Sequence, residues 1–196
     1  MQKALIVGMG RSGIGAYKWL TQQGWAVTCF DKNPEVASQL GFPVLSDDTD
    51  ITGTQFDLVV PSPGIPTSHK AIVAAASQGA EVVGELELGL RAVKGSVIGV
   101  TGTNGKTTMT LFLEHLFDQE GKKAVALGNV GYSLCEFLSE HPEDTSLKII
   151  EMSSFQLETL KAKALDIAII TSFSKDHLDR HKTMEAYARA KLNIVA

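Results

Sequence analysis

The stretch GVTGTNGKTTMT, residues 99–110, decides the fold of the second half of the chain. It begins in an apolar run and leads into the periodic segment TMTLFLEHLF, so that a strand, a glycine-containing loop and a helix follow one another as in a phosphate-binding loop. Gly102 and Gly105 allow backbone amides to wrap phosphate oxygens. Lys106 can reach the terminal phosphates of a nucleotide, and the hydroxyl of Thr107 can ligate Mg²⁺. The stretch therefore predicts a nucleoside triphosphate site.

This loop departs from the Walker A pattern at one position. Val100 stands where the first glycine of G-x-x-x-x-G-K-[ST] belongs. The residues that contact phosphate and metal are all present, so the variant keeps the chemistry of the motif. The alternative is a chance Gly-Lys-Thr in an ordinary turn, and the strand and helix on either side argue against it.

Short β-branched runs alternate with amphipathic stretches along the chain, from KALIVG near the start to LKIIEMSS and DIAIITSF near the end. This alternation predicts parallel sheets covered by helices, which is an α/β fold. A predicted helix ends within RAVKGS, and we place a domain junction there. We expect a Rossmann-like domain at residues 1–93 and an incomplete P-loop-type, parallel-sheet ATPase domain at residues 94–196. The apolar periodicity of the helices predicts mostly core positions, among them Ile14, Tyr17, Leu20, Leu111, Phe112, His115 and Leu116.

The first half has its own glycine turn, GMGRSG at residues 8–13, between the strand ALIV and a helix. It is a full G-x-G-x-x-G, and Asp31 ends the next strand at the distance usual for a dinucleotide site. The glycines admit a pyrophosphate and the helix N-terminus attracts anions, so a UDP group suits this turn as well as NAD does. The alternative is a tight turn without a ligand. PSPGI, residues 61–65, either faces the same crevice or merely terminates a strand.

Three further residues stand near the ends of later elements. Glu151 ends the strand LKIIE, where a carboxylate can serve the metal of a P-loop enzyme. His177 follows the next strand in SKDHLDRH, at the corresponding place. Each has a plain alternative, as an exposed glutamate or a solvated histidine. Lys191 shares a helix face with Tyr187, and the pattern alone indicates a surface lysine.

The composition argues against several classes of function. The net charge is −4, whereas a protein that binds nucleic acid usually concentrates lysine and arginine on a basic face. Cys29 and Cys135 show no metal or redox spacing, so we expect two core residues in a reducing compartment. No stretch is apolar for long enough to insert into a membrane, and no signal peptide is evident. We expect a cytoplasmic protein.

Five segments together resemble the Mur ligases, the ATP-dependent amino-acid ligases of peptidoglycan precursor synthesis. They are GVTGTNGKTT, GNVG at 128–131, EMSSFQLET at 151–159, DHLDRH at 176–181 and ARAKL at 188–192. SSFQLE, SPGI and GELEL are most similar to the members that join D-glutamate to UDP-N-acetylmuramoyl-L-alanine. The resemblance implies that reaction, with the substrate carboxylate activated by ATP as an acyl phosphate before the amine attacks. It also implies ATP, two Mg²⁺ ions and a monomeric enzyme.

The resemblance implies roles for individual residues. Lys106, His177 and Lys191 would be catalytic. Thr107 and Glu151 would hold the first Mg²⁺, and His177 and Lys191 the second, with Lys191 carbamylated by CO2. ATP would be bound by Gly102, Thr103, Asn104, Gly105, Lys106, Thr107 and Thr108. The UDP part of the substrate would be bound by Gly10, Arg11, Ser12, Asp31, Lys32, Ser62, Pro63, Gly64 and Ile65, and the muramoyl part by Asn129, Ser153 and Gln156.

Family members are more than twice as long as this chain and have a third domain that binds the amino acid. We therefore expect a fragment that is inactive alone. Another Mur ligase or a folylpolyglutamate synthase-like ligase is an alternative, although the latter lacks a unit like the one that carries GMGRSG. An NAD-binding oxidoreductase or sensor and a non-catalytic nucleotide-binding module are further alternatives.

Overall fold

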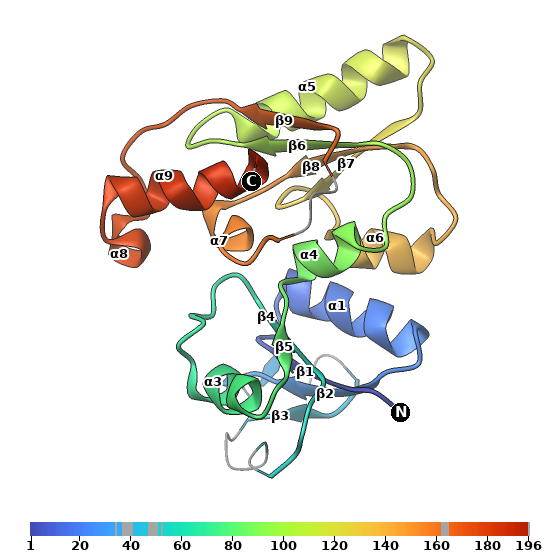
Figure 1. The fold of residues 1–196 in the computed structure, drawn as a ribbon. Coiled ribbons are helices and arrows are strands. Elements are labelled where there is room, and N and C mark those ends of the chain that lie inside the picture. The colour runs from blue at the N-terminus through green and yellow to red at the C-terminus, as the bar shows by residue number, and fades with distance from the viewer. Residues whose placement is uncertain (34, 37–40, 47–50, 52, 162–164, 196) are drawn as a thin grey trace.

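The computed structural model describes residues 1–33, 35–36, 41–46, 51, 53–161 and 165–195. Two α/β units follow one another, each built on a sheet in which every pairing is parallel. Figure 1 shows one unit below the other, with helices between the two sheets. The predicted fold class, a Rossmann-like unit followed by a P-loop-type unit, is confirmed.

The first unit has a five-stranded sheet in the order β3-β2-β1-β4-β5. Strand β1 is central, so the turn that follows it opens at the middle of the carboxyl edge of the sheet. The elements are β1 (Lys3–Val7), α1 (Arg11–Gln22), β2 (Ala26–Phe30), β3 (Val44–Leu45), β4 (Leu58–Pro61), α3 (Lys70–Ser77) and β5 (Glu81–Val82).

Side chains of β1 alternate between the two faces of this sheet. Ala4 and Ile6 pack in the cluster that contains Ala16 and Leu20 of α1. Leu5 and Val7 pack in the cluster that contains Ile72 and other residues of α3. The period of two along the strand therefore gives the sheet a helix layer on each face. The predicted core positions Ile14, Tyr17 and Leu20 pack against the first of these clusters.

The second unit has a four-stranded sheet in the order β7-β8-β6-β9. Strand β6, which leads into the predicted phosphate loop, lies between β8 and β9. The elements are β6 (Val97–Thr101), α5 (Lys106–Gln119), β7 (Ala124–Gly128), α6 (Leu134–Glu140), β8 (Leu147–Glu151), α7 (Ser154–Leu157), β9 (Ile167–Ile170), α8 (Leu178–His181), α9 (Met184–Leu192) and η2 (Asn193–Val195).

The core prediction for helix α5 was wrong. Leu111, Phe112 and Leu116 are 45%, 56% and 43% exposed, and His115 is also exposed. The helix instead packs on its sheet through another stripe, made by Met109, Leu113 and Phe117. Both stripes have helical spacing, so periodicity could not tell which one faces the sheet.

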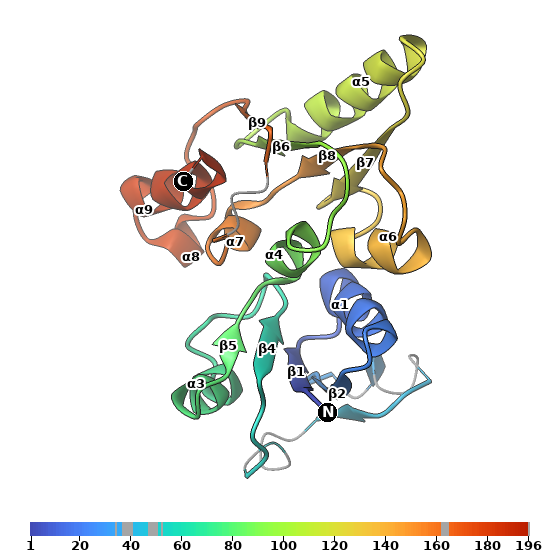
Figure 2. The same cartoon turned by 45° about the vertical axis from the view of Figure 1, so that its right-hand side comes forward.

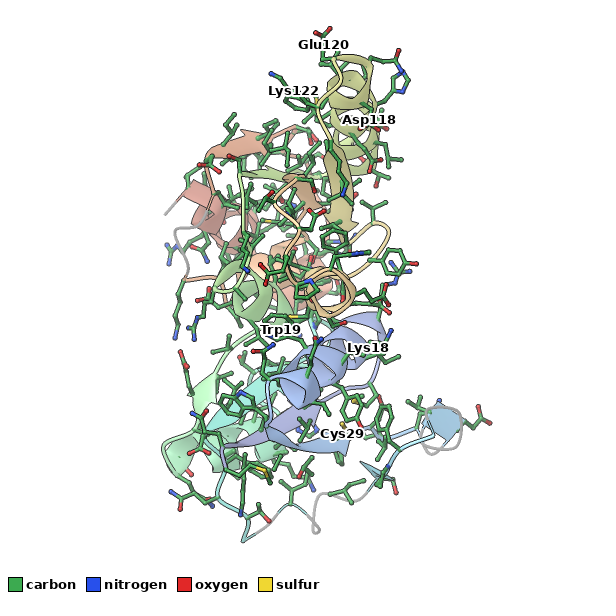
Figure 3. The ribbon with its side chains drawn as sticks, turned by 90° about the vertical axis from the view of Figure 1, so that its right-hand side faces the viewer. Lys18, Trp19, Cys29, Asp118, Glu120 and Lys122 are labelled. Atoms are coloured by element: carbon green, nitrogen blue, oxygen red, sulfur yellow. The ribbon has the colours of Figure 1, made fainter. Side chains whose placement is uncertain are left out.

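Three helices join the two units: α1 of the first, α6 of the second, and α4 (Glu85–Leu90) between them. Figure 2 shows these helices between the sheets, and Figure 3 shows Lys18 and Trp19 of α1 at the junction. Leu86 and Leu90 of α4 pack in the core of the second unit, and Trp19 lies against the same core. The boundary at residues 93–94 stays a prediction, but the packing couples α4 to the second unit.

Cys29 and Cys135 are free and buried, as expected of core residues. Within the described part of the chain, no helix combines the length and apolar character that crossing a membrane requires.

Candidate active site

Helix α5 begins at the predicted phosphate loop without a side chain that caps it. Its N-cap is Gly105, at φ 82°, a left-handed conformation that glycine adopts without strain. The first turn of the helix contains no acidic residue. The first amides of the helix therefore stay free to bind an anion, and the positive end of the helix dipole favours one there.

The end of strand β9 braces this loop from the side. The Thr171 hydroxyl donates to the Asn104 carbonyl oxygen at 2.6 Å, and the Asn104 amide donates to the Ser172 hydroxyl at 2.9 Å. Gly102, at φ 146°, has no room for a side chain, because a Cβ there would lie 2.0 Å from the Thr171 hydroxyl oxygen. The backbone of the loop is thus held in place by the neighbouring strand.

Thr107, Glu151 and Asn129 meet beside the loop. The Thr107 hydroxyl donates to Glu151 Oε2 at 2.6 Å, and the Asn129 side-chain amide donates to Glu151 Oε1 at 2.8 Å. Strands β6 and β8 pair with Val100 opposite Glu151, which brings the carboxylate to the loop. Asn129, predicted for the muramoyl part of the substrate, thus contacts the predicted metal ligand.

Two lysines donate to carbonyl oxygens of the loop. Lys106 Nζ lies 2.9 Å from the Thr103 carbonyl oxygen, and Lys191 Nζ lies 2.7 Å from that of Gly102. Lys191 is only 2% exposed, so the expectation of a surface lysine was wrong. Burial, together with the positive charge of Lys106, lowers the pKa of Lys191 to about 8. An amine with such a pKa is partly neutral near pH 8 and can act as a nucleophile.

An aromatic cluster supports Lys191. Its ammonium lies 4.8 Å from the ring centroid of Tyr187, and the Tyr187 hydroxyl shares a hydrogen bond of 3.0 Å with the Thr103 hydroxyl. The ring of His177 contacts the same tyrosine edge-on at 6.4 Å. The side chains of His177 and Lys191 therefore both lie against the ring of Tyr187. His181, which the sequence did not single out, is buried beside them, and its Nε2 lies 3.0 Å from the Ser154 hydroxyl oxygen.

The glycine turn of the first unit is packed against its own chain. A Cβ at Gly13 would lie 2.1 Å from the Gly8 carbonyl oxygen, and one at Gly8 would lie 2.9 Å from Ser62 Cβ. The Ser62 hydroxyl donates to the Gly8 carbonyl oxygen at 2.7 Å, and Asp31 Oδ2 accepts from the Met9 amide at 2.7 Å. Ser62 and Asp31, both predicted to bind substrate, therefore also shape this turn.

Helix α1 resembles α5 at its start. Its N-cap is Gly10, no side chain caps it, and its first turn has no acidic residue. Gly10 and Arg11 are exposed and Ser12 is half-buried, so the turn is open to a ligand. Its first amides can donate hydrogen bonds to a diphosphate in the same way as those of α5.

A short path of contacts links the two turns. Arg11 Nη1 donates to the Gly131 carbonyl oxygen at 3.2 Å, across the junction between the units. Gly131 lies two residues beyond Asn129, which reaches Glu151 and through it Thr107. The predicted UDP site and the predicted ATP site therefore meet at the segment that follows strand β7.

The remaining predicted substrate residues lie at two other places. Ser153 and Gln156 form a capping box at the start of α7, where the Ser153 hydroxyl accepts from the Gln156 amide and Gln156 Oε1 accepts from the Ser153 amide. Gln156 lines a narrow crevice between the units with Ser62, Pro63 and Ile65. Lys32 and Gly64 are exposed.

The donor set at the P-loop fits a magnesium–nucleotide complex. Mg²⁺ prefers oxygen ligands, takes few from the protein and binds further oxygens of phosphate and water. The Thr107 hydroxyl and the Glu151 carboxylate, which is 1% exposed, supply two such oxygens. Among the described residues, no group of three His, Cys, Asp or Glu side chains can hold a metal by itself. A metal here would need the phosphates as ligands.

The residues that support the site were not evident from the sequence, whereas those at its centre were. Thr171, Ser172 and Tyr187 hold the loop, and Glu85 lies buried at the junction, where it accepts from the Cys135 amide at 2.6 Å. Burial raises the pKa of Glu85 to about 7. The one available signal was the polar TS at the end of DIAIITSF, which becomes informative only when β9 is known to lie beside β6.

Two family models match the chain. The Mur ligase MurD-like N-terminal domain matches residues 2–84, and the Mur ligase middle domain matches residues 100–196. Among curated relatives, the UDP-N-acetylmuramoylalanine–D-glutamate ligase of Protochlamydia amoebophila is 42% identical over 98% of this chain and 45% of its own length. That of Trichormus variabilis is 40% identical over 100% of this chain and 45% of its length. The chain spans about half the length of these relatives.

Solved structures show the same fold at lower identity. The chain is similar to a UDP-N-acetylmuramate:L-alanyl-gamma-D-glutamyl-meso-diaminopimelate ligase from Neisseria meningitides, with a TM-score of 0.63, 19% identity, and coverage of 100% of this chain and 68% of that one. The UDP-N-acetylmuramate–alanine ligase MurC of Thermotoga maritima gives a TM-score of 0.59 at 20% identity, covering 99% of this chain and 47% of that one. With its MurD-like N-terminal domain and its middle domain, the chain belongs to the Mur ligase family.

Proposed function

We propose that the chain is the nucleotide-binding part of an ATP-dependent ligase that joins D-glutamate to UDP-N-acetylmuramoyl-L-alanine. The observation that carries the proposal is the contact path from Arg11 through the segment of Gly131 and Asn129 to Glu151 and Thr107. It brings a turn suited to a diphosphate next to a loop suited to a triphosphate. A substrate held by its UDP part in the first unit can then extend its free carboxylate toward the second. The curated relatives carry the name of this activity.

The reaction needs two anions to approach each other, because the substrate carboxylate attacks the γ-phosphate of ATP. In the proposed complex, the free amides of α5 and the ammonium of Lys106 bind the phosphates and offset this repulsion. Thr107 and Glu151 would hold Mg²⁺, and the ion would supply further positive charge. The loop is already braced by β9, so little reorganisation is needed on binding.

Lys191 has a separate role in this proposal. An amine that is partly neutral near pH 8 can react with CO2 to form a carbamate, and the product is an oxygen ligand like a carboxylate. His177 lies on the same tyrosine and would complete a second Mg²⁺ site. A monomeric state stays a prediction that rests on the resemblance to the family, and a cytoplasmic location stays a prediction from the sequence, in which no apolar span and no signal peptide is evident.

The test uses the whole protein that contains this chain. It asks whether an oxygen atom of the substrate carboxylate is transferred to the released phosphate. The muramoyl substrate is labelled with ¹⁸O in its carboxylate and incubated with ATP, Mg²⁺ and D-glutamate. Attack of the carboxylate on phosphorus leaves one labelled oxygen in the phosphate that is released when the amine forms the amide. We expect labelled phosphate, ADP and amide in equal amounts. Unlabelled phosphate, or no dependence on D-glutamate, would refute the proposal.

A binding experiment separates this function from the oxidoreductase alternative. The protein is titrated with UDP-N-acetylmuramoyl-L-alanine and with NADH, and heat or fluorescence is recorded. We expect saturable binding of UDP-N-acetylmuramoyl-L-alanine and none of NADH. The reason is that the contact path from the glycine turn of the first unit leads to a phosphate loop, where no hydride acceptor would bind. Saturable binding of NADH alone would favour the alternative.

A further inference from the structure

A cavity of about 180 Å³ opens at the carboxyl edge of the first sheet, between the segments that follow β1, β2 and β4. It exceeds many times over the space that one water molecule needs. Gly8 of the glycine turn lines it, together with Phe30, Asp31, Lys32, Ile65, Pro66 and His69. In an open parallel sheet, the nucleoside of a ligand whose diphosphate binds the first turn lies at this place.

His69 enters this cavity in a defined protonation state. It is the N-cap of α3, and its Nδ1 accepts a hydrogen bond from the Ala71 amide at 3.3 Å. A ring nitrogen that accepts carries no proton, so the proton of the neutral imidazole lies on Nε2. Burial lowers the pKa of His69, and so does the charge of Lys32, and both favour the neutral form of the ring. His69 therefore presents a hydrogen-bond donor and no second acceptor.

The ring is also held in place. It packs against the ring of Phe30 with a centroid distance of 5.7 Å. Its Nε2 makes no hydrogen bond to the residues that the structure describes, so this donor remains available to a ligand in the cavity.

We infer that His69 selects the base of the substrate by donating from Nε2–H to the carbonyl oxygen at position 4 of uracil. This inference rests on the proposed function, because it takes the ligand of the first unit to be a nucleoside diphosphate. The glycine turn holds the diphosphate end, so the edge of the base farthest from the sugar points away from the turn, toward α3. Cytosine has an amino group at position 4, and two donors would then face each other. A site that offers a hydrogen-bond donor here binds cytosine poorly, because the Nε2–H group of His69 and the amino group of the base are both left without an acceptor.

The test compares UDP with CDP by calorimetric titration of the whole protein. We expect UDP to bind at least about tenfold more tightly than CDP. In His69→Asp, the aspartate still caps α3 but offers only acceptors, so the preference should fall below about threefold or reverse. Ser68→Asp places the same charge on the neighbouring exposed residue and should keep the preference of the unmodified protein. Circular dichroism and the thermal midpoint verify that each variant is folded.

Each outcome bears on a different claim. If the unmodified protein does not bind UDP, the proposed function fails. If it binds UDP and CDP equally, or if His69→Asp keeps the full preference for UDP, the inference about His69 is wrong while the proposed function stands. Equal weakening of UDP and CDP in His69→Asp would also overturn it, since His69 would then shape the cavity without selecting the base.

Discussion

The two glycine turns of this molecule use the same backbone device in different surroundings. Both lead from a strand into a helix whose first amides have no side-chain cap. The backbone of the first glycine turn is packed at Gly8 and Gly13 against its own unit, and its one basic side chain, Arg11, donates to a backbone carbonyl oxygen of the other unit. The second contains Lys106, has Lys191 against it and is braced by a neighbouring strand. In both glycine turns the backbone can bind a diphosphate. Only the second turn adds positively charged side chains, which a triphosphate needs.

Removal of Lys106 tests this comparison most strongly. In Lys106→Ala, ATP-dependent turnover should fall by about 10²- to 10³-fold, because a fixed charge at the transferred phosphate is lost. Affinity for UDP should not change. Lys122→Ala, an exposed lysine beyond the other end of α5, is the control (Figure 3). An equal loss of UDP and ATP binding would show that the two turns do not act separately.

Glycine replacement tests whether tight packing at Gly13 fixes the backbone of the first glycine turn. Gly13→Ala places a Cβ 2.1 Å from the Gly8 carbonyl oxygen and should lower the free energy of unfolding by about 3 kcal/mol. Gly10→Ala is the matched control, since nothing lies within 4 Å of its Cβ and its φ is −73°. Urea denaturation measures both. Similar stabilities of the two variants would contradict the packing argument.

The titration of Glu85, which is buried at the junction between the two units, should make the stability of the protein depend on pH. Its pKa is about 7 in the folded protein and near 4.5 when unfolded, so the folded state binds more protons between these values. Stability should therefore fall by about 2 kcal/mol as the pH rises from 5 to 7. Glu85→Gln removes the titration, and its stability should change less over the same range. If the free energy of unfolding of the unmodified protein and of Glu85→Gln changed equally with pH, Glu85 would not be the group that titrates.

The pair of Lys18 and Glu136 should have the smallest effect. It joins α1 to α6 at 2.8 Å, but the lysine side chain is 41% exposed. Lys18→Ala should lower the free energy of unfolding by roughly 0.5 kcal/mol, and added salt should reduce the difference. Thermal unfolding at low and high salt measures it. A loss several times larger would mean that this exposed pair fixes the two units together.

The sequence was most informative where local chemistry and local structure coincide. The order of strand, loop and helix around Lys106 and Thr107 placed the second turn correctly. It was misleading for Lys191 and for Leu111, Phe112 and Leu116, because a periodic pattern gives the spacing of residues but not which stripe is buried. Supports such as Thr171 and Tyr187 could not be predicted, since they act on residues 67 and 84 positions away.

The sequence by itself determined the two parallel units, the positions of both glycine turns and the residue types that can bind phosphate and metal. These features depend on residues close together in the chain, where alternation, glycine spacing and helix periodicity suffice. Only the tertiary structure decided that Arg11 reaches Gly131, that Asn129 and Thr107 meet on Glu151, and that Lys191 is buried. Such contacts depend on strand order and on how helices pack between sheets, and both are set by the burial of apolar surface across the whole chain.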